Sequence, residues 1–253
     1  MSDYNEIKRV SKIYDDRASR LNSIDAAGQW GSKELSEKIT EEILKKIELD
    51  KNDIVLEIGC GNGVLGNIIS KKSQMFVGFD VSNLMLKKFQ NEHIGINIIQ
   101  ASATHIPLRN DYFDKVVLNG VSMYFSNEEF FKNVITEIKM VCKNKALIFI
   151  GENIVPSKYC WELVWFQDLP FLFQILAKPY IKFRRWVAGK NPYLAGKWKY
   201  MHKDVSPKII KKIFKNFESI TISDSASYTI RKKIFGKNTK GNKRMDFLIK
   251  IND

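Results

Sequence analysis

The chain of 253 residues is 44% hydrophobic and 27% charged, an ordinary balance for a soluble globular protein and enough chain for one α/β domain with a sizeable core. Its polar N-terminal segment predicts no signal peptide. Three widely spaced cysteines, Cys60, Cys142 and Cys160, argue against a disulfide framework or a metal cluster and favour a reduced, cytoplasmic protein.

The net charge of +13 is concentrated in the C-terminal part of the chain. Residues 1–150 hold 20 basic and 20 acidic residues, whereas residues 151–253 hold 21 basic and 8 acidic ones. Four of the five tryptophans also follow residue 150. This asymmetry indicates an anionic partner or surface, with solvated lysine-rich faces as the alternative.

Hydrophobic periodicity predicts two helices, at 3–20 and 32–47, and then an alternation of strands and helices. The expected strands are 53–58, 75–80, 96–100, 113–119 and 146–150, and the helices between them begin at 64, 82 and 127. Such alternation predicts an α/β fold with a Rossmann-like, doubly wound, mostly parallel sheet and helices on both faces. Ligands of such sheets bind outside the carboxyl ends of the strands.

The pattern changes after residue 150 and returns near the C-terminus. Residues 154–200 are dense in aromatic and basic residues and contain no clear strand. A helix is then expected at 206–214, with Pro207 at its first position. Strands follow at 219–223 and 246–251, joined by a link rich in glycine and lysine. The sheet is therefore expected to resume after an insertion.

The first predicted strand runs into the sequence VLEIGCGNGVLG, residues 55–66, which fits two cofactor patterns. Gly61 to Gly66 matches the G-x-G-x-x-G of a dinucleotide-binding turn, and Glu57 to Gly63 matches an acidic-x-G-x-G-x-G turn. A carboxylate at this strand end repels a pyrophosphate by roughly a few kcal/mol at about 4 Å. It attracts the sulfonium and ammonium groups of S-adenosylmethionine. Glu57 therefore favours S-adenosylmethionine over NAD and makes the match at 61–66 a coincidence.

Asp80 ends the second predicted strand, where a carboxylate can accept hydrogen bonds from both ribose hydroxyls of an adenosine. NAD sites use the same device, so Asp80 supports an adenosine ligand without separating the two cofactors. A helix N-cap is the alternative role, because Asp80 comes just before the next predicted helix.

Residues 53–150 resemble a class I S-adenosylmethionine-dependent methyltransferase of the small-molecule type, similar to the methyltransferase domain 11 group. The resemblance rests on VLEIGCGNG, VGFDVSNLMLKKF, IIQASATHIPLRNDYFDKVVLNGVSMYF and ALIFIGEN, in that order. It implies S-adenosyl-L-methionine as cofactor, S-adenosyl-L-homocysteine as product and an antiparallel last strand. It covers the middle of the chain well, the closing helix and strands loosely, and the insertion not at all.

By position, the resemblance implies one set of residues around the cofactor: Tyr14, Glu57, Gly59, Cys60, Gly61, Asp80, Val81, Met85, Ser102, Ala103 and Asn119. Glu57 and the glycine loop would surround the methionine part, and Asp80 would hold the ribose beside Val81 and Met85. Cys60 is expected to be a small pocket residue and not a redox thiol.

Two positions need separate comment. Asn119 and Gly120 follow the fourth predicted strand and would line the methyl-transfer site. Ser102 stands where many relatives have an aspartate that contacts the adenine amine, so that contact is expected to pass to backbone groups around Ser102 and Ala103.

This class has no universal catalytic residue, because positioning the acceptor supplies much of the acceleration and a base is needed only if the acceptor loses a proton. Two candidates are Tyr124, after the fourth strand, and His202, at the end of the insertion. The alternatives are a core aromatic for Tyr124 and a surface histidine for His202. His93 and His105 are expected to lie away from the reaction.

Within the insertion, residues 161–190 are rich in large apolar side chains and then turn basic. Polar residues interrupt the apolar part too often for a membrane span. The segment is expected to be a lid over an apolar acceptor, or an interfacial segment on anionic lipid. A further hydrophobic subdomain, a dimer surface and nucleic-acid binding are the alternatives.

The sequence thus predicts a methyltransferase that acts on a hydrophobic or membrane-derived small molecule, cytoplasmic or peripheral at the inner membrane face. The alternatives are a nucleic-acid-binding protein or RNA methyltransferase that uses the basic C-terminal region, and an NAD-dependent oxidoreductase. A single methyltransferase domain, 1–253, is expected. Its parts are an N-terminal helical cap (1–50), a cofactor-binding core (53–150), the insertion (154–200) and the closing helix and strands (206–253).

Overall fold

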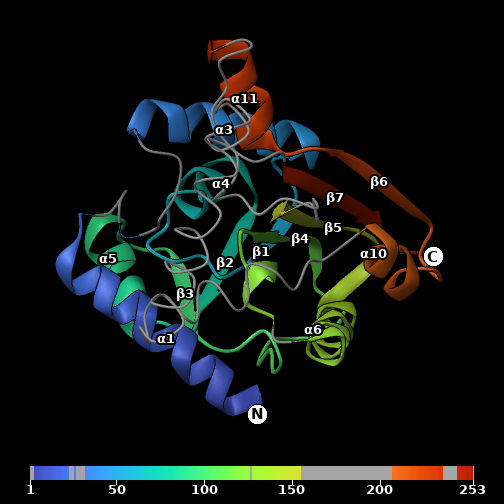
Figure 1. The fold of residues 1–253 in the computed structure, drawn as a ribbon, viewed down its shortest axis with the longest axis horizontal. Coiled ribbons are helices and arrows are strands. Elements are labelled where there is room, and N and C mark those ends of the chain that lie inside the picture. The colour runs from blue at the N-terminus through green and yellow to red at the C-terminus, as the bar shows by residue number, and fades with distance from the viewer. Residues whose placement is uncertain are drawn as a thin grey trace, which may run out of the picture.

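The structure, a computed structural model, describes residues 3–22, 26, 32–125, 127–154, 207–235 and 244–252. Seven strands form one sheet in the order β3-β2-β1-β4-β5-β7-β6 (Figure 1). They are β1 (Ile54–Ile58), β2 (Met75–Asp80), β3 (Asn97–Gln100), β4 (Phe113–Asn119), β5 (Cys142–Ile154), β6 (Ser219–Asp224) and β7 (Arg244–Lys250).

The strand directions confirm the predicted sheet. Neighbours from β3 to β5 pair in parallel, and β7 lies antiparallel between β5 and β6. The chain order reverses between β1 and β4, so the carboxyl ends of these two strands form the switch point of the sheet.

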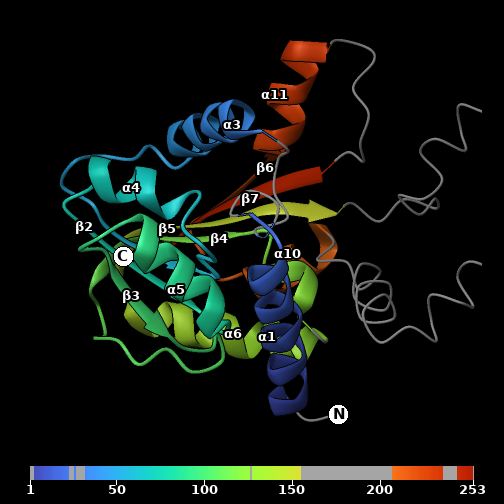
Figure 2. The same ribbon diagram turned by 90° about the vertical axis from the view of Figure 1, so that its left-hand side faces the viewer.

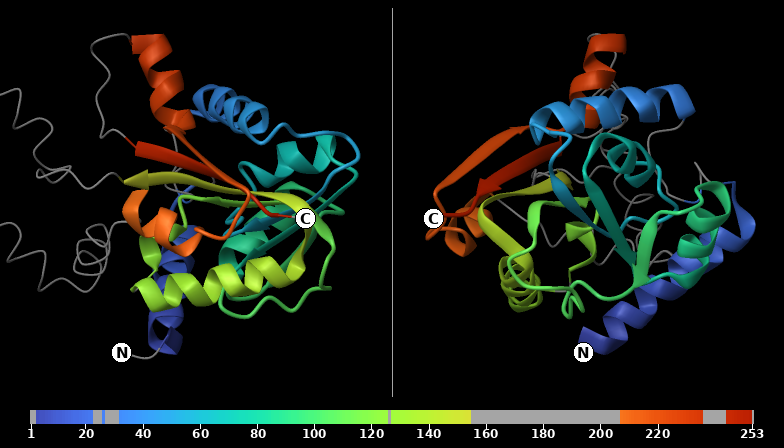
Figure 3. Two further views of the ribbon diagram at one scale, coloured as in Figure 1. Left: turned by 90° about the vertical axis from the view of Figure 1, so that its right-hand side faces the viewer. Right: turned by 180° about the vertical axis from the view of Figure 1, so that it is seen from behind.

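Helices lie on both faces and across one edge of this sheet (Figure 3). They are α1 (Asp3–Arg20), α3 (Lys33–Lys46), α4 (Gly66–Lys72), α5 (Asn83–Glu92), the 3₁₀ turn η1 (Ser122–Tyr124), α6 (Glu128–Val141), α10 (Pro207–Ile213) and α11 (Ala226–Phe235). No helix among these described residues is long and apolar enough to cross a membrane.

The core has two halves because side chains alternate along each strand. Leu56 and Val116 point to one face, where they pack with the apolar sides of α6 and α10. Val55 and Val117 point to the other face, where they pack with α3, α4, α5 and α11. Burying both faces explains why the parallel strands read as continuous apolar runs.

Helix α1 lies at the carboxyl ends of the parallel strands, on the side toward which the arrow of β5 points in Figure 2. Its C-terminal half packs beside α5, with which it shares many contacts. Its N-terminal end lies near the connection between β4 and α6 (Figure 1). Helix α3, in contrast, packs on a face of the sheet and against α11.

Two features of the C-terminal elements were not predicted. Helix α11 forms between β6 and β7, and β5 continues past residue 150 to Ile154. The extension contains a bulge between Ile150 and Asn153, where Glu152 adopts a φ of +61°. A bulge of this kind re-aims side chains at the end of a strand.

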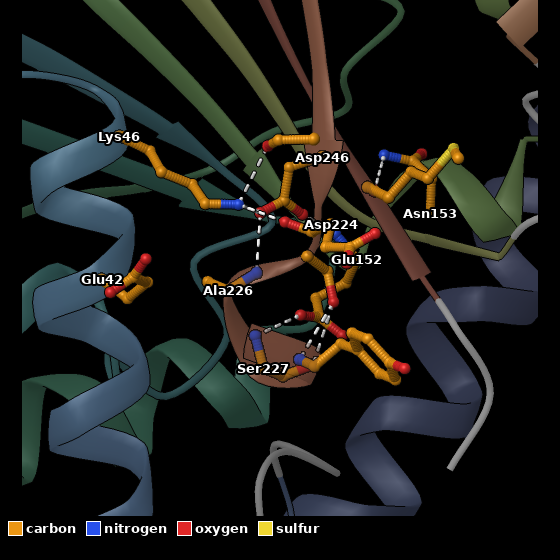
Figure 4. A network of polar contacts seen from close by, with 12 residues as sticks. Glu42, Lys46, Glu152, Asn153, Asp224, Ala226, Ser227 and Asp246 are labelled. Carbon is orange, nitrogen blue, oxygen red and sulfur yellow. Dashed lines mark hydrogen bonds and ion pairs between the residues drawn. The ribbon is translucent and has the colours of Figure 1, made fainter. Parts of the chain in front are cut away.

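The bulge and β7 together hold the start of α11 through two buried carboxylates (Figure 4). Asp246 accepts hydrogen bonds from the backbone N–H groups of Ala226 and Glu152, at 2.8 and 2.9 Å, and pairs with Lys46 of α3 at 2.8 Å. Glu152 accepts from the N–H of Ser227 at 3.2 Å and pairs with Arg244 at 3.0 Å. Tertiary contacts therefore satisfy two N–H groups at the helix N-terminus, and the Ser225 hydroxyl accepts from the N–H of Tyr228 at 3.2 Å as a local N-cap.

Candidate active site

A cavity lies at the carboxyl ends of β1, β2 and β4, where the sheet topology places a ligand. It holds about 920 Å³ of space free of protein atoms, part of it open to solvent. Every residue predicted to surround the cofactor lines this cavity, and so does Tyr124.

The loop after β1 forms the floor of the cavity. The backbone N–H groups of Gly59 and Cys60 both donate to the carbonyl oxygen of Phe79, at 2.7 and 3.0 Å. This turn requires φ values of +74° at Gly59 and +54° at Gly61, which side-chain-bearing residues rarely adopt. The glycines thus bring the backbone of β1 against the end of β2.

Gly66 has a packing role at the start of α4. A Cβ atom there would lie 2.6 Å from the ring of Phe76 and 2.8 Å from Oε2 of Glu57. Helix α4 can therefore approach the sheet only because residue 66 lacks a side chain. Helix packing therefore explains the glycine at position 66, so the match of Gly61 to Gly66 with the dinucleotide pattern does not require a dinucleotide.

Glu57 places a buried carboxylate at the end of β1. Its side chain lies on the face covered by α3 and α4, is 4% exposed, and its Oε2 atom has no hydrogen-bond partner. Burial raises the pKa of the Glu57 carboxyl well above its usual range, and the nearby Asp80 adds to the rise. A bound cation beside this carboxylate would relieve both penalties.

Asp80 closes the loop from the end of β2. Its carboxylate accepts hydrogen bonds from the N–H groups of Gly61 at 2.9 Å and Ser82 at 2.8 Å. Burial raises the pKa of Asp80, and these two hydrogen bonds partly offset the rise. The N-cap of α5 is Ser82, whose hydroxyl accepts from the N–H of Met85, so Asp80 is not the cap of that helix.

Asn119 occupies the corresponding end of β4. Its side chain is 5% exposed, and neither its Nδ2 nor its Oδ1 atom has a hydrogen-bond partner. Unpaired buried amides are rare and call for a ligand or water. Asn119 and Glu57 thus present unmet hydrogen-bonding capacity to the same cavity.

Helix α1 is fastened over the cavity by polar contacts to the β2–α5 connection. The Ser11 hydroxyl donates to the carbonyl oxygen of Val81 at 3.0 Å. One carboxylate oxygen of Asp15 accepts from the Ser82 hydroxyl at 2.6 Å and from the N–H of Leu84 at 3.0 Å. A carboxylate at the N-terminus of α5 also suits the helix dipole.

Two tyrosines meet above the middle of the cavity. The hydroxyls of Tyr14 on α1 and Tyr124 in η1 lie 2.6 Å apart, and their rings pack edge to face with centroids 5.7 Å apart. Burial raises the pKa of the Tyr14 phenol well above its usual range, and the proximity of Tyr124 adds to the rise. Tyr14 is therefore a neutral hydroxyl at physiological pH and cannot act as a phenolate base.

Comparison with known proteins places these features in a family. Residues 55–145 match a family model described as a methyltransferase domain. An uncharacterised methyltransferase of Schizosaccharomyces pombe is 33% identical over 87 residues, which cover 33% of this chain and 33% of that protein. A tRNA (carboxymethyluridine(34)-5-O)-methyltransferase of Arabidopsis thaliana is 28% identical over 146 residues, or 57% of this chain and 32% of that protein.

Solved structures show the same fold. A phosphoethanolamine N-methyltransferase of Haemonchus contortus, in complex with phosphoethanolamine and S-adenosylhomocysteine, has a TM-score of 0.66 at 14% identity, covering 100% of this chain and 50% of that one. Residues 55–145 therefore match a methyltransferase domain, and the fold of the chain is that of the S-adenosylhomocysteine-bound methyltransferase structure. The chain matches only about a third of the length of the two sequence relatives.

The charges that line the cavity suit S-adenosylmethionine as a ligand. None of the described residues that line the cavity is Lys, Arg or His, whereas Glu57 and Asp80 are both carboxylates. A ligand with a sulfonium and an ammonium compensates these charges, and a pyrophosphate would add to them. The unpaired atoms of Glu57 and Asn119 supply hydrogen-bonding capacity for such a ligand.

The remaining residues predicted to surround the cofactor differ in the chemical groups that they could present to a ligand. Met85 is fully buried under α1, beside Ala18 and Ala26. Cys60 is a free, buried thiol whose pKa burial raises well above its usual range, which agrees with a small, unreactive pocket residue. The Ser102 hydroxyl is engaged with Thr104, so that position offers mainly backbone groups to a ligand.

The two histidines of the described residues, His93 and His105, do not line the cavity. His93 caps the end of α5 and packs edge to face on Phe89, and His105 is exposed in the loop before β4. The predicted catalytic residue His202 and the predicted membrane segment 161–190 lie outside the described residues. Of the two catalytic candidates, only Tyr124 belongs to the described residues, and its hydroxyl faces that of Tyr14.

Sequence reasoning missed the part of the cavity that α1 builds from Glu6, Ile7 and Val10. These residues share a face of the helix with Tyr14, at spacings of eight, seven and four residues, and that spacing was the available signal. Glu6 is an acidic residue on a helix whose polar sequence predicts a solvent-exposed cap, so no other feature of the sequence indicated that Glu6 would be buried.

Proposed function

We propose that this chain transfers a methyl group from S-adenosylmethionine to a small molecule with an apolar body. One observation carries the proposal. The cavity that Glu57, Asp80 and Asn119 line is also lined by the apolar side chains of Ile7, Val10, Val121, Phe125 and Phe130. A cofactor end and an apolar end in one cavity suit a reaction between a cofactor and an apolar acceptor.

The roles of the cofactor residues follow from where they lie. Bound S-adenosylmethionine supplies a methyl group on a sulfonium. Glu57 and the glycine loop would surround the methionine part, Asp80 would bind the ribose, and Met85 would pack against the adenine. Asn119 orients groups near the methyl-transfer site. The tyrosine pair closes α1 over the reacting atoms and excludes water, which is a positioning role.

The chain is proposed to act as one methyltransferase domain over residues 1–253. Its insertion, 154–200, would complete the acceptor side as a lid or as a contact with a membrane surface, from which an apolar acceptor is drawn. Protein that binds anionic vesicles only while residues 161–190 are intact would support the membrane contact. Equal binding after replacement of that segment would argue against it.

Turnover with S-adenosylmethionine tests the proposed function. The protein is incubated with the cofactor and extracts of small apolar metabolites, and S-adenosylhomocysteine is measured by mass spectrometry. Fractions that support its formation should contain small molecules with a mass gain of one methyl group. Methylation confined to RNA fractions would contradict the proposal.

A second candidate is RNA methylation through the basic C-terminal region, favoured by the similarity to a tRNA methyltransferase of Arabidopsis thaliana. Phosphate contacts make such binding fall log-linearly with salt. RNA affinity that drops steeply between low and physiological salt, together with methyl transfer to that RNA, would support this candidate. Weak, non-productive RNA binding would leave the small-molecule acceptor as the better account.

A further inference from the structure

Glu6 is an unassigned buried carboxylate in the acceptor end of the cavity. It lies on α1, its side chain is 3% exposed, and it lines the cavity beside Ile7 and Val10. An ionisable side chain is almost never this buried without a partner or a function. Its position eight residues before Tyr14 puts it about 12 Å farther along the helix axis, on the side away from α5.

The partner of Glu6 holds only one side of the carboxylate. Both hydrogen bonds from Arg9, at 3.1 Å from Nε and 2.5 Å from Nη2, go to Oε1. The described residues supply no hydrogen bond to Oε2. Glu6 lines the cavity and Arg9 does not, so the residue that holds Oε1 lies outside the lining, and Oε2 is the oxygen left for a ligand.

The surroundings of Glu6 decide what this oxygen can bind. Four apolar side chains line the cavity together with it, those of Ile7, Val10, Phe125 and Phe130. The other acids of the lining, Glu57 and Asp80, lie at the ends of β1 and β2. No basic side chain stands among the described lining residues. An anionic acceptor would meet only like charge there, whereas a cation would be favoured.

We infer that the acceptor is an amine on an apolar body, and that Glu6 selects it by holding its ammonium group. This inference rests on the proposed function, because it names the substrate class of the same cavity. Glu6 is thus a specificity-determining residue. A charge-assisted hydrogen bond in a shielded site contributes about 1.5–3 kcal/mol, equivalent to about tenfold or more in affinity.

A set of matched probes tests the inference on the full chain saturated with S-adenosylhomocysteine. Octylamine, 1-octanol and octanoate share one apolar chain and differ in charge. Isothermal titration should give the lowest Kd for octylamine, an intermediate Kd for 1-octanol and the weakest binding for octanoate. No detectable octylamine binding, or octanoate binding as tight as octylamine, would overturn the inference.

Two variants assign the selectivity to Glu6. Glu6→Gln keeps the size and removes the charge, so octylamine affinity should fall about tenfold while 1-octanol affinity stays within about twofold. Glu34→Gln, an exposed position on α3 that does not line the cavity, makes the same change in net charge and should alter neither. Unchanged amine preference in Glu6→Gln would overturn the role of Glu6.

Binding of S-adenosylhomocysteine separates this inference from the function on which it rests. All three proteins should show the same thermal stabilisation by that ligand, which also shows that the variants are folded. Loss of stabilisation in the wild type would refute the methyltransferase proposal itself. Retained stabilisation with no preference for the amine would refute only the assignment of the acceptor.

Discussion

The hydroxyl oxygens of Tyr14 and Tyr124 lie 2.6 Å apart, and this hydrogen bond joins the N-terminal helix to the connection after β4. Both residues line the cavity, so the bond spans its opening. Because the raised pKa keeps Tyr14 neutral, the contact is a hydrogen bond between two hydroxyls and not an ionised pair. This hydrogen bond therefore fastens α1 beside the cavity.

Removing either hydroxyl should loosen α1. We expect Tyr14→Phe and Tyr124→Phe each to weaken S-adenosylhomocysteine binding about fivefold, because a hydrogen bond contributes about 1 kcal/mol. The double variant should be no weaker than the worse single variant, since both lose the same bond. Tyr4→Phe, on the same helix but 68% exposed, is the control and should bind normally. Additive losses in the double variant would show that the hydroxyls act separately.

The pH dependence of cofactor binding should report on Glu57. Its pKa is raised in the free protein by burial and by Asp80, and a bound cation favours the ionised form. Binding of S-adenosylmethionine should therefore release a proton and tighten as pH rises through that raised pKa. Titration calorimetry in two buffers of different ionisation enthalpy measures the proton release.

Glu57→Gln removes the titrating group. We expect it to bind S-adenosylmethionine about tenfold or more weakly at pH 8, with no proton release. The exposed Glu41→Gln, which pairs with Lys72 outside the cavity, controls for net charge. Proton release that persists in Glu57→Gln would show that another group responds to the cofactor.

Gly66→Ala should destabilise the fold. The added methyl would lie 2.6 Å from the Phe76 ring and 2.8 Å from Oε2 of Glu57, so α4 must shift. Such overpacking costs about 1–3 kcal/mol, measurable by urea unfolding. Ser70→Ala, on the same helix, loses only a hydrogen bond to Asn67 and should change stability by about 0.5 kcal/mol or less. An equally stable Gly66→Ala protein would contradict this packing role.

Asp246 should add a pH-dependent contribution to stability near the start of α11. Burial raises the pKa of Asp246 to about 6, although the ion pair with Lys46 opposes the rise. The folded state then holds the proton more tightly than the unfolded state does. The contribution is present below the unfolded pKa and is lost as pH rises through the folded pKa, by about 1 kcal/mol between pH 5 and 7.

The comparison with Asp246→Asn isolates that contribution, because asparagine does not titrate. The stability of the wild type relative to Asp246→Asn should fall by about 1 kcal/mol from pH 5 to pH 7. Asp16→Asn, at a partly exposed position on α1, makes the same change in net charge and serves as the control. A difference between wild type and Asp246→Asn that is constant with pH would contradict the raised pKa.

Local sequence patterns were sufficient to predict the sheet and the residues that line the cavity beside Glu57 and Asp80. Strand periodicity and the position of Glu57 and Asp80 at strand ends depend on neighbouring residues, so they can be read without the fold. All the residues predicted around the cofactor line one cavity, although their contacts with it stay a prediction.

What could not be predicted depends on contacts between distant segments. Helix α11 begins where Asp246 and Glu152 accept its first N–H groups, and both come from other strands. The burial of Glu6 arises only when α1 folds over the strand ends, which its polar sequence did not announce. The tyrosine pair likewise joins residues 110 positions apart.

The central claim is that the cavity beside Glu57 binds S-adenosylmethionine and not a dinucleotide. Thermal unfolding of the protein with S-adenosylhomocysteine and, separately, with NAD tests it directly. Ligand at 100 times its Kd should stabilise the protein by about 2.7 kcal/mol. We predict this shift for S-adenosylhomocysteine, its loss in Asp80→Ala, and no shift for NAD. Stabilisation by NAD alone would contradict the account.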